Sequence, residues 1–170
     1  LVLIATFLIS LILTPFVRLL AFKIDAVDYP NVRRINKKPM PSAGGLAIIL
    51  AFTIATVILL PMITKGYVAK TSYLTYTLPV VAGGWIIGLT GLVDDIKELS
   101  PRLKMLGIFL GASVIWFFTD FRLNDFKIPF GGPFLHFDPW LSYILTVIWI
   151  ISITNAVNLI DGLDGLVSGV

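Results

Sequence analysis

The chain has 170 residues, of which 57% are hydrophobic and only 14% are charged, and its mean hydropathy is +0.94. A soluble domain of this size usually carries about 25% charged residues, so the composition excludes an ordinary soluble domain and predicts an integral membrane protein. The absence of cysteine excludes disulfides and thiolate metal sites, and the net charge of +3 concerns membrane topology rather than nucleic acid.

Five apolar runs predict five transmembrane helices, because about 20 helical residues cross the hydrocarbon core of a bilayer. Ser100-Pro101 and Asp138-Pro139 have the pattern of an N-cap followed by proline at the first helical position. They are expected to begin the fourth and fifth helices. The five runs cover residues 1–22, 44–63, 78–93, 103–118 and 140–154.

The predicted fold class is therefore an all-α, polytopic transmembrane helix bundle. The third run contains four glycines, which give it a small-residue face for close helix packing and are compatible with a homodimer. Residues 121–137 alternate loosely around Gly131-Gly132-Pro133, which predicts a short external β-hairpin. Because a new apolar run begins after Gly165, we expect residues 1–170 to form a single integral-membrane domain that is the N-terminal part of a larger bundle.

The basic residues predict which side of the membrane each loop occupies. Five spans place the odd-numbered loops on one side and the even-numbered loops on the other. Nine of the 13 basic residues lie on the first side, and an excess of Lys and Arg marks the cytoplasmic side. The nine are Arg18, Lys23, Arg33, Arg34, Lys37, Lys38, Lys97, Arg102 and Lys104; the other four are Lys65, Lys70, Arg122 and Lys127.

The polar stretch 155–165 follows the fifth apolar run and lies on the predicted cytoplasmic side. Ser152, Asn155, Asn158 and Asp161 recur at every third position, so successive members share one face of a helix. One interpretation is a helix end followed by a turn, where Asn, Asp and Gly are common. Four polar side chains in register at the edge of a membrane span favour a functional site, because polar groups there are costly.

A second polar site, Asp94-Asp95, follows the third apolar run. Carboxylates at the C-terminal end of a helix oppose its dipole, so a simple helix-end role explains them poorly, although Asp94 could cap a short helix through Glu98. The alternative is a hard cation held by oxygen ligands, which favours Mg²⁺ or Mn²⁺ over zinc. The candidate ligands are Asp94, Asp95, Asn155, Asn158, Asp161 and Asp164.

The basic loop before the second span supplies groups that would bind phosphate. Lys37 and Lys38 can neutralise phosphate charge, while Ser42 and the amides near Gly44-Gly45 can donate hydrogen bonds at a helix start. The alternative is a positive-inside cluster that contacts lipid headgroups. Together with two acidic sites on the same side, the loop favours a phosphate and metal centre.

Four segments, taken in chain order, resemble the polyprenyl-phosphate sugar-1-phosphate transferases. This family includes the phospho-MurNAc-pentapeptide transferases, but the spacing of the segments is more similar to the GlcNAc-1-phosphate branch. The resemblance implies a bundle of about ten or eleven spans with a cytoplasmic active site in the plasma membrane of a prokaryote. It also implies Mg²⁺-dependent transfer of a sugar-1-phosphate from a UDP-sugar to polyprenyl phosphate, with release of UMP. This is the initiating step of envelope glycans such as teichoic acid or lipopolysaccharide O-antigen. The segments are 30–34, 41–47, 91–104 and 155–165.

The resemblance also assigns roles to single residues. The family's GlcNAc-1-phosphate branch usually has histidine where Asn36 stands, so whatever that imidazole contributes is missing or supplied differently. Whether the transfer is direct or passes through a covalent Asp intermediate stays open. Expected roles are catalysis for Asp94, Asp95, Asp161 and Lys104; substrate binding for Lys37, Lys38, Ser42, Asn155 and Asp164; and metal binding for Asn158, Asp161, Asp94 and Asp95.

Two other functions fit part of the pattern. An intramembrane prenyltransferase would also use Mg²⁺ and aspartates, but it would have two separated Asp-rich helical motifs, which the segment 94–98 fits poorly. A cation-coupled transporter would place its carboxylates near the bilayer midplane, whereas these lie at the ends of spans. The sequence does not specify the sugar, the lipid length or the envelope polymer.

Overall fold

The computed structural model describes the whole chain except residues 1, 29–38, 64–69, 129–131 and 161–170. Six α-helices account for most of the described residues: α1 (Val2–Lys23), α2 (Gly44–Thr53), α3 (Leu60–Ile63), α4 (Lys70–Lys97), α5 (Pro101–Phe118) and α6 (Pro139–Ile160). A π-helical segment, η1 (Ile54–Leu59), joins α2 to α3. Two short antiparallel ribbons pair β1 (Val27–Asp28) with β2 (Met40–Pro41), and β3 (Asp125–Lys127) with β4 (Phe134–His136).

The five predicted spans are confirmed as helices, and with them the all-α class. Five helices are long and apolar enough to cross a membrane: Leu3–Lys23, Gly44–Met62, Thr77–Lys97, Pro101–Phe118 and Pro139–Asn158. Helices dominate because a backbone in lipid must satisfy its hydrogen bonds within the same segment. The helix starts at Pro101 and Pro139 are also confirmed, although Ser100 makes no side-chain cap hydrogen bond.

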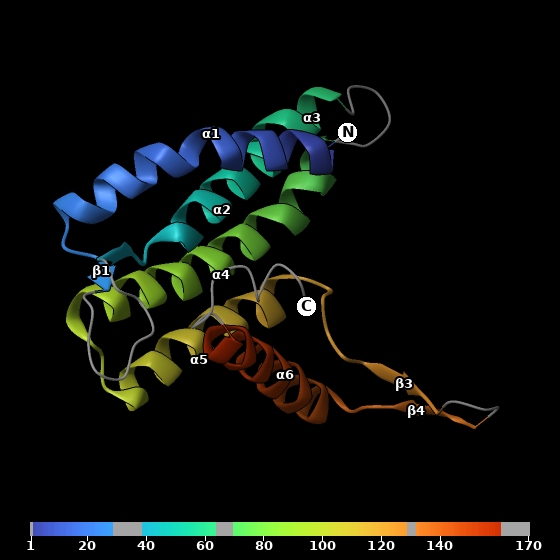
Figure 1. The fold of residues 1–170 in the computed structure, drawn as a ribbon. Helices are drawn as coiled ribbons and strands as arrows, with labels where there is room; N and C mark the ends of the chain where they lie inside the picture. The colour runs from blue at the N-terminus through green and yellow to red at the C-terminus, as the bar shows by residue number, and fades with distance from the viewer. Residues whose placement is uncertain (1, 29–38, 64–69, 129–131, 161–170) are drawn as a thin grey trace.

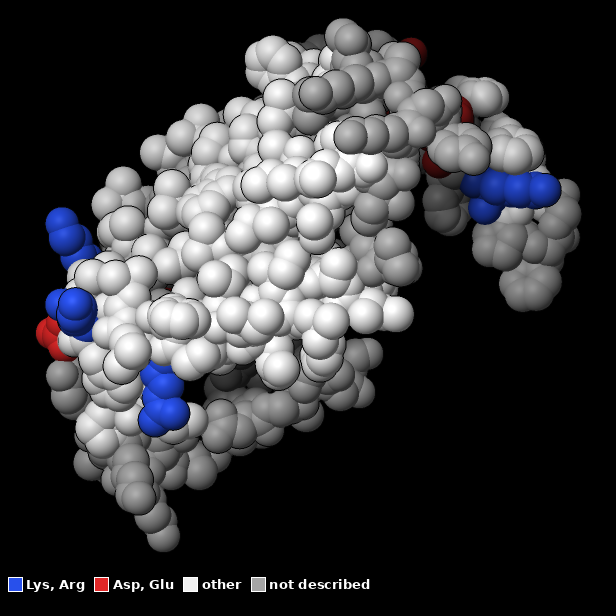
Figure 2. Space-filling model, turned by 90° about the horizontal axis from the view of Figure 1, so that it is seen from above, with Lys and Arg blue, Asp and Glu red and all other residues white. Residues whose placement is uncertain are grey.

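The helices form one layered bundle in which α4 is central (Figure 1). Helices α1 and α2 lie on one side of α4, and α5 and α6 lie on the other. On the face shown in Figure 2, charged residues gather at the two ends and leave a broad belt without them between. This distribution matches a bundle that crosses a bilayer, with its charged ends in water.

Small residues let the central helices pack closely. A Cβ on Gly83 of α4 would lie 2.7 Å from the carbonyl oxygen of Gly111 on α5. A Cβ on Gly111 would lie equally close, at 2.7 Å, to the carbonyl oxygen of Gly83. A Cβ on Gly88 would meet Ile49 of α2, also at 2.7 Å. Two of the four glycines of the predicted small-residue face, Gly83 and Gly88, are therefore used within the bundle, whereas a Cβ on Gly84 or Gly91 would meet nothing within 4 Å.

A second cluster of small residues holds the ends of α1 and α2 together. Ala21, Ala26 and Ala43 are almost fully buried and pack with Val17 and Ala47, and Leu92 of α4 packs against the same cluster. The main chain after α1 is held by a hydrogen bond from Ala26 N to Ala21 O, 3.0 Å long. This cluster fixes the base of the β1–β2 ribbon beside the end of α4.

Candidate active site

The candidate site lies where α4 ends, α5 begins and α6 ends. Helix α4 continues through Asp94 and Asp95 to Lys97, one turn further than the apolar run predicts. Glu98 then takes a left-handed conformation, with φ of 47°, and its N–H donates to the carbonyl oxygen of Asp94 at 2.8 Å. This turn reverses the chain so that α5 can pack back along α4.

Asp94 has a helix-end role that the sequence argument discounted. Its Oδ1 accepts a hydrogen bond of 3.0 Å from the Leu99 N–H, just beyond the turn at Glu98. The left-handed residue aims that N–H back at the carboxylate, and the local hydrogen bond offsets the unfavourable helix dipole. The alternative of a short helix starting at Asp94 is wrong, because α4 runs unbroken to Lys97.

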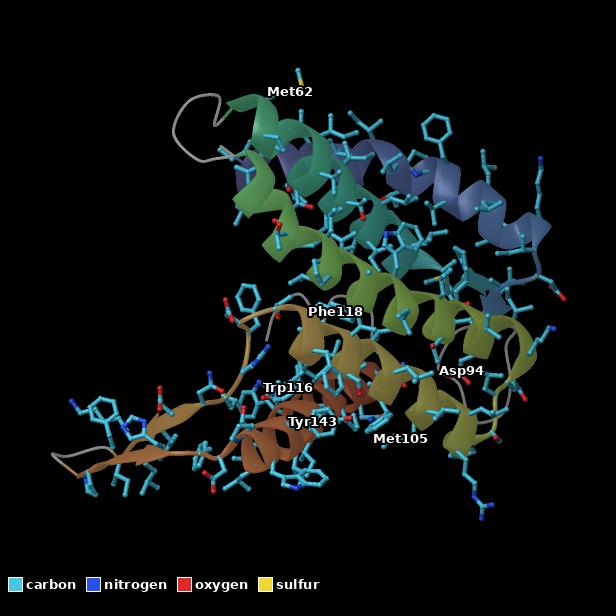
Figure 3. All side chains as sticks on the ribbon, turned by 180° about the vertical axis from the view of Figure 1, so that it is seen from behind. Met62, Asp94, Met105, Trp116, Phe118 and Tyr143 are labelled. Carbon is cyan, nitrogen blue, oxygen red and sulfur yellow. The ribbon has the colours of Figure 1, made fainter. Side chains whose placement is uncertain are left out.

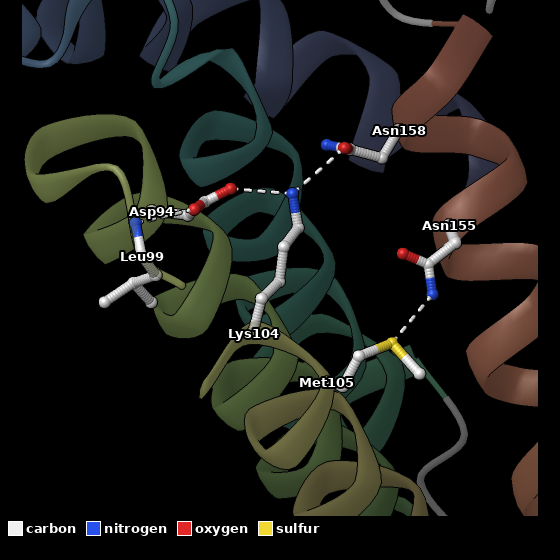
Figure 4. Close-up of polar contacts among 6 residues, drawn as sticks. All are labelled: Asp94, Leu99, Lys104, Met105, Asn155 and Asn158. Carbon is white, nitrogen blue, oxygen red and sulfur yellow. Dashed lines mark hydrogen bonds and ion pairs between the residues drawn. The ribbon is translucent and has the colours of Figure 1, made fainter. Parts of the chain in front are cut away.

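Lys104 joins three helices at this point (Figure 4). Its Nζ lies 2.6 Å from Oδ2 of Asp94 on α4 and donates to Oδ1 of Asn158 on α6 at 3.0 Å. The lysine and aspartate side chains are 21% and 20% exposed, so the ion pair is largely withdrawn from water. A charge-assisted hydrogen bond in such surroundings is stronger than one on an open surface.

Asn155 lies one turn before Asn158 on the same face of α6. Its Nδ2 donates to the carbonyl oxygen of Ile151 at 2.9 Å and approaches Sδ of Met105 at 3.5 Å (Figure 4). Lys104 and Met105 are neighbours on α5, so the two asparagines contact adjacent positions of the facing helix. The three-residue spacing therefore places Asn155 and Asn158 together, as predicted from helix periodicity.

A pocket of about 200 Å³ lies against the Lys104 network. Its polar lining comes from Lys104, Asn158, Thr90 and Thr154, and the rest of its wall is mainly apolar. Neither threonine was predicted from the sequence as a site residue, although each precedes a site residue by four positions and so lies on the same helix face. The remaining lining residues are Ile87, Gly91, Ile108 and Val157.

Ser42 lies at the same end of the bundle but outside the Lys104 network. Its hydroxyl donates to the carbonyl oxygen of Ala26 at 3.0 Å, and its N–H donates to the same oxygen at 3.1 Å. Ser42 therefore ties the start of α2 to the end of α1, and substrate binding by this residue stays a prediction.

Of the remaining residues predicted for the site, only Asp95 lies in the described part of the chain. It is exposed on the last turn of α4. In the part of the chain that the structure describes, no three His, Cys, Asp or Glu residues lie close enough together to hold a metal ion. Five residues named from the sequence fall outside the described residues: Asn36, Lys37, Lys38, Asp161 and Asp164.

Comparison with known proteins gives the family. The model of glycosyl transferase family 4 matches residues 77–170, more than half of the chain, and this segment contains the whole Asp94, Lys104 and Asn158 network. The chain belongs to glycosyl transferase family 4. No solved structure gives a significant match.

Three curated relatives show how this family 4 chain compares along its length. A probable undecaprenyl-phosphate N-acetylglucosaminyl 1-phosphate transferase of Bacillus subtilis is 39% identical over 98% of the chain and 43% of the relative. A decaprenyl-phosphate N-acetylglucosaminephosphotransferase of Mycolicibacterium smegmatis is 36% identical over 95% of the chain and 39% of the relative. A phospho-N-acetylmuramoyl-pentapeptide-transferase of Bacillus subtilis is 32% identical over 95% of the chain and 51% of the relative. The chain therefore spans about half or less of each relative.

Proposed function

We propose that the full-length protein transfers GlcNAc-1-phosphate from UDP-GlcNAc to undecaprenyl phosphate or a similar polyprenyl phosphate and releases UMP. The activities after which two relatives are named support the sugar and the lipid acceptor. The observation that carries the proposal is Lys104, whose ammonium group is held between Asp94 and Asn158 at one end of a membrane bundle. That arrangement places a positive charge beside apolar helices, where the phosphate of a membrane lipid would arrive.

The network leaves Lys104 able to bind an anion. An ammonium group has three N–H donors, and its contacts with Asp94 and Asn158 use two of them. The third can donate to a phosphate oxygen. The adjoining pocket has Lys104 and Asn158 beside Ile87, Ile108 and Val157, so it combines a charged group with apolar walls, as a lipid phosphate requires.

The chemistry needs charge stabilisation more than activation of a weak nucleophile. A phosphate monoester has a second pKa near 6 and is largely dianionic at pH 7, so its oxygen is already nucleophilic. We propose that this oxygen attacks the phosphorus that bears the sugar, breaks the bond to the UMP oxygen and releases UMP. Lys104 would stabilise the charge that develops during transfer. Asp94 positions Lys104, and Asp95 on the same helical turn would orient or deprotonate the lipid phosphate.

Mg²⁺ or Mn²⁺ fits the chemistry of the residues proposed to hold it. Asp94, Asp95, Asn158 and Asp161 offer only oxygen ligands, which hard divalent cations prefer. Two of these candidates, Asp94 and Asn158, also bind the ammonium group of Lys104. Such an ion, when bound, would neutralise phosphate charge.

The site end is proposed to face the cytoplasm, across the plasma membrane of a prokaryote. Nine of the 13 basic residues lie on that side of the predicted topology, and Lys and Arg are enriched in cytoplasmic loops. UDP-sugars are made in the cytoplasm, so this orientation would give the site access to its donor.

Substitution of the two carboxylates in the full-length protein tests the proposal. Asp94→Ala and Asp95→Ala are expected to remove UMP release while leaving membrane insertion and detergent extraction intact. Asp138→Ala is the matched control, because Asp138 is exposed and precedes α6 at the opposite end. Normal rates in both site variants would overturn the assignment. Pyrophosphate release in place of UMP would indicate a prenyltransferase.

A further inference from the structure

The β3–β4 hairpin has one apolar face and one mostly polar face, which also carries Phe134. Phe126 pairs with Leu135, while the flanking pairs, Asp125 with His136 and Lys127 with Phe134, point to the opposite side of the ribbon. On the polar face, His136 Nδ1 contacts Oδ1 of Asp125, and Lys127 Nζ lies 5.2 Å from the centre of the Phe134 ring. All six strand residues are exposed.

The base of the hairpin is fixed to α5 and α6 by a buried polar network. Ser142 of α6 is fully buried; its hydroxyl donates to Oδ1 of Asn124 at 3.0 Å and accepts from Trp116 Nε1 at 3.3 Å. The Leu123 N–H donates to the Thr146 hydroxyl at 3.0 Å. These bonds attach the start of the hairpin to α6, so its position relative to the bundle is defined.

Arg122 reinforces the same attachment from α5. Its Nε donates to the carbonyl oxygens of Trp116 at 3.0 Å and Thr119 at 2.9 Å, and its guanidinium lies 4.6 Å from the centre of the Trp116 ring. At the far side of the base, the Phe137 N–H donates to the carbonyl oxygen of Asn124 at 2.8 Å and closes the ribbon. The hairpin is therefore held as an ordered projection.

This projection needs something to cover its apolar face. An isolated two-stranded hairpin is at best marginally stable in water, and here Phe126 and Leu135 are 52% and 42% exposed. The hairpin extends away from the helices in both Figure 1 and Figure 3. Among the described elements, none provides a covering layer for it.

The chain connections place the hairpin at the membrane surface. Two residues separate β4 from the start of α6, and six separate α5 from β3. Both helices are long and apolar enough to span the membrane. Trp140, at the start of α6, is exposed and is a residue type enriched at membrane–water interfaces. Phe117, Phe118 and Phe121 are also exposed near the base of the hairpin.

We infer that the hairpin lies flat in the lipid interface, with the apolar face formed by Phe126, Ile128 and Leu135 against the acyl boundary and the Asp125–His136 face towards water. The interfacial layer is about 5–8 Å thick on each side of the hydrocarbon core. An arm of four residues is about 13 Å long, so an upright hairpin would leave most of its apolar face in water. This surface lies at the end of α5 and α6 opposite the candidate active site and is independent of the proposed reaction.

Spin labels on the two faces test the inference in full-length protein reconstituted into phosphatidylcholine liposomes. Phe126→Cys and Leu135→Cys report on the apolar face, and Asp125→Cys and Lys127→Cys are the matched controls on the polar face. Residues 1–170 contain no cysteine, so only cysteines elsewhere need replacement. For each label, the measured quantity is the ratio of its collision rate with dissolved oxygen to its collision rate with a water-soluble nickel chelate. This ratio is expected to be several-fold higher at positions 126 and 135 than at positions 125 and 127.

Two results would overturn the inference. Equal access of the nickel chelate to both faces would show that the hairpin stands in water. Exclusion of both reagents at 126 and 135 would show that protein covers the apolar face. Spin–spin broadening that disappears when labelled protein is diluted with unlabelled protein would then identify a second copy as the covering partner. Because all four positions are exposed, size-exclusion profiles like that of the parent protein are expected and serve as the folding control.

Discussion

The ion pair between Lys104 and Asp94 gives a quantitative test of the site, through Lys104→Met. Methionine keeps much of the apolar stem of lysine but removes the ammonium group, and with it the contacts of 2.6 Å to Asp94 and 3.0 Å to Asn158. Exposed ion pairs contribute about 0–1 kcal/mol, and removing one partner of a fully buried pair costs about 3–5 kcal/mol. With side chains 21% and 20% exposed, the pair lies between these limits. We expect the free energy of unfolding to fall by about 2 kcal/mol.

A double-mutant cycle separates this ion pair from other effects of the substitution. Asp94→Asn keeps an oxygen that can accept from the Leu99 N–H but removes the charge that faces Lys104. Unfolding free energies from SDS titration in mixed micelles should give a coupling energy of about 1–2 kcal/mol between the two positions. Arg102→Met is the matched control, because Arg102 is exposed on the first turn of α5, and its effect should stay within about 0.5 kcal/mol. Zero coupling, or equal losses for Lys104→Met and Arg102→Met, would refute the reasoning.

Three further substitutions test other contacts by the same titration. Gly111→Ala should lower the free energy of unfolding by about 1–3 kcal/mol, because the new Cβ would lie 2.7 Å from a carbonyl oxygen on α4. Gly84→Ala is the control for helix propensity: its new Cβ would meet nothing within 4 Å, so this variant should not be less stable than the parent protein. Ser42→Ala should cost about 1 kcal/mol, because it removes the side-chain hydrogen bond to the Ala26 carbonyl oxygen and leaves only the one from the backbone N–H; unchanged stability would contradict that role. Ser142→Ala should cost about 1–3 kcal/mol by leaving the Trp116 indole N–H without its acceptor; a loss of UMP release per folded molecule would show that this distant network also affects the site.

The spans could be predicted from the sequence because the bilayer imposes one length and one composition on each helix. The pairing of β3 with β4 could be predicted from a local pattern, since alternating residues on both sides of a Gly-Gly-Pro sequence are typical of a hairpin. The end of α4, in contrast, could not be predicted from the sequence. It depends on Glu98 taking a φ of 47°, a conformation that few non-glycine residues adopt and that no residue pattern in this stretch predicts.

The candidate site shows the same division. Helix periodicity placed Asn155 and Asn158 on one face, because that relation is local. The contact between Lys104 and Asn158 joins positions 54 residues apart, and only the packing of α5 against α6 brings them together. Lys104 was named from the resemblance to a family, and neither charge nor spacing identified it. The roles of all the predicted site residues stay predictions, and Asp161, Asp164, Lys37 and Lys38 also lie outside the described part of the chain.

The central claim is most directly tested by UMP release from the full-length protein in detergent. The reaction would contain UDP-GlcNAc, undecaprenyl phosphate and Mg²⁺, with each component omitted in turn. We predict that UMP forms only when all three are present, and that another UDP-sugar replacing UDP-GlcNAc would change only the assignment of the sugar. Failure to release UMP from any UDP-sugar, in protein shown to be folded, would contradict the proposed transferase activity.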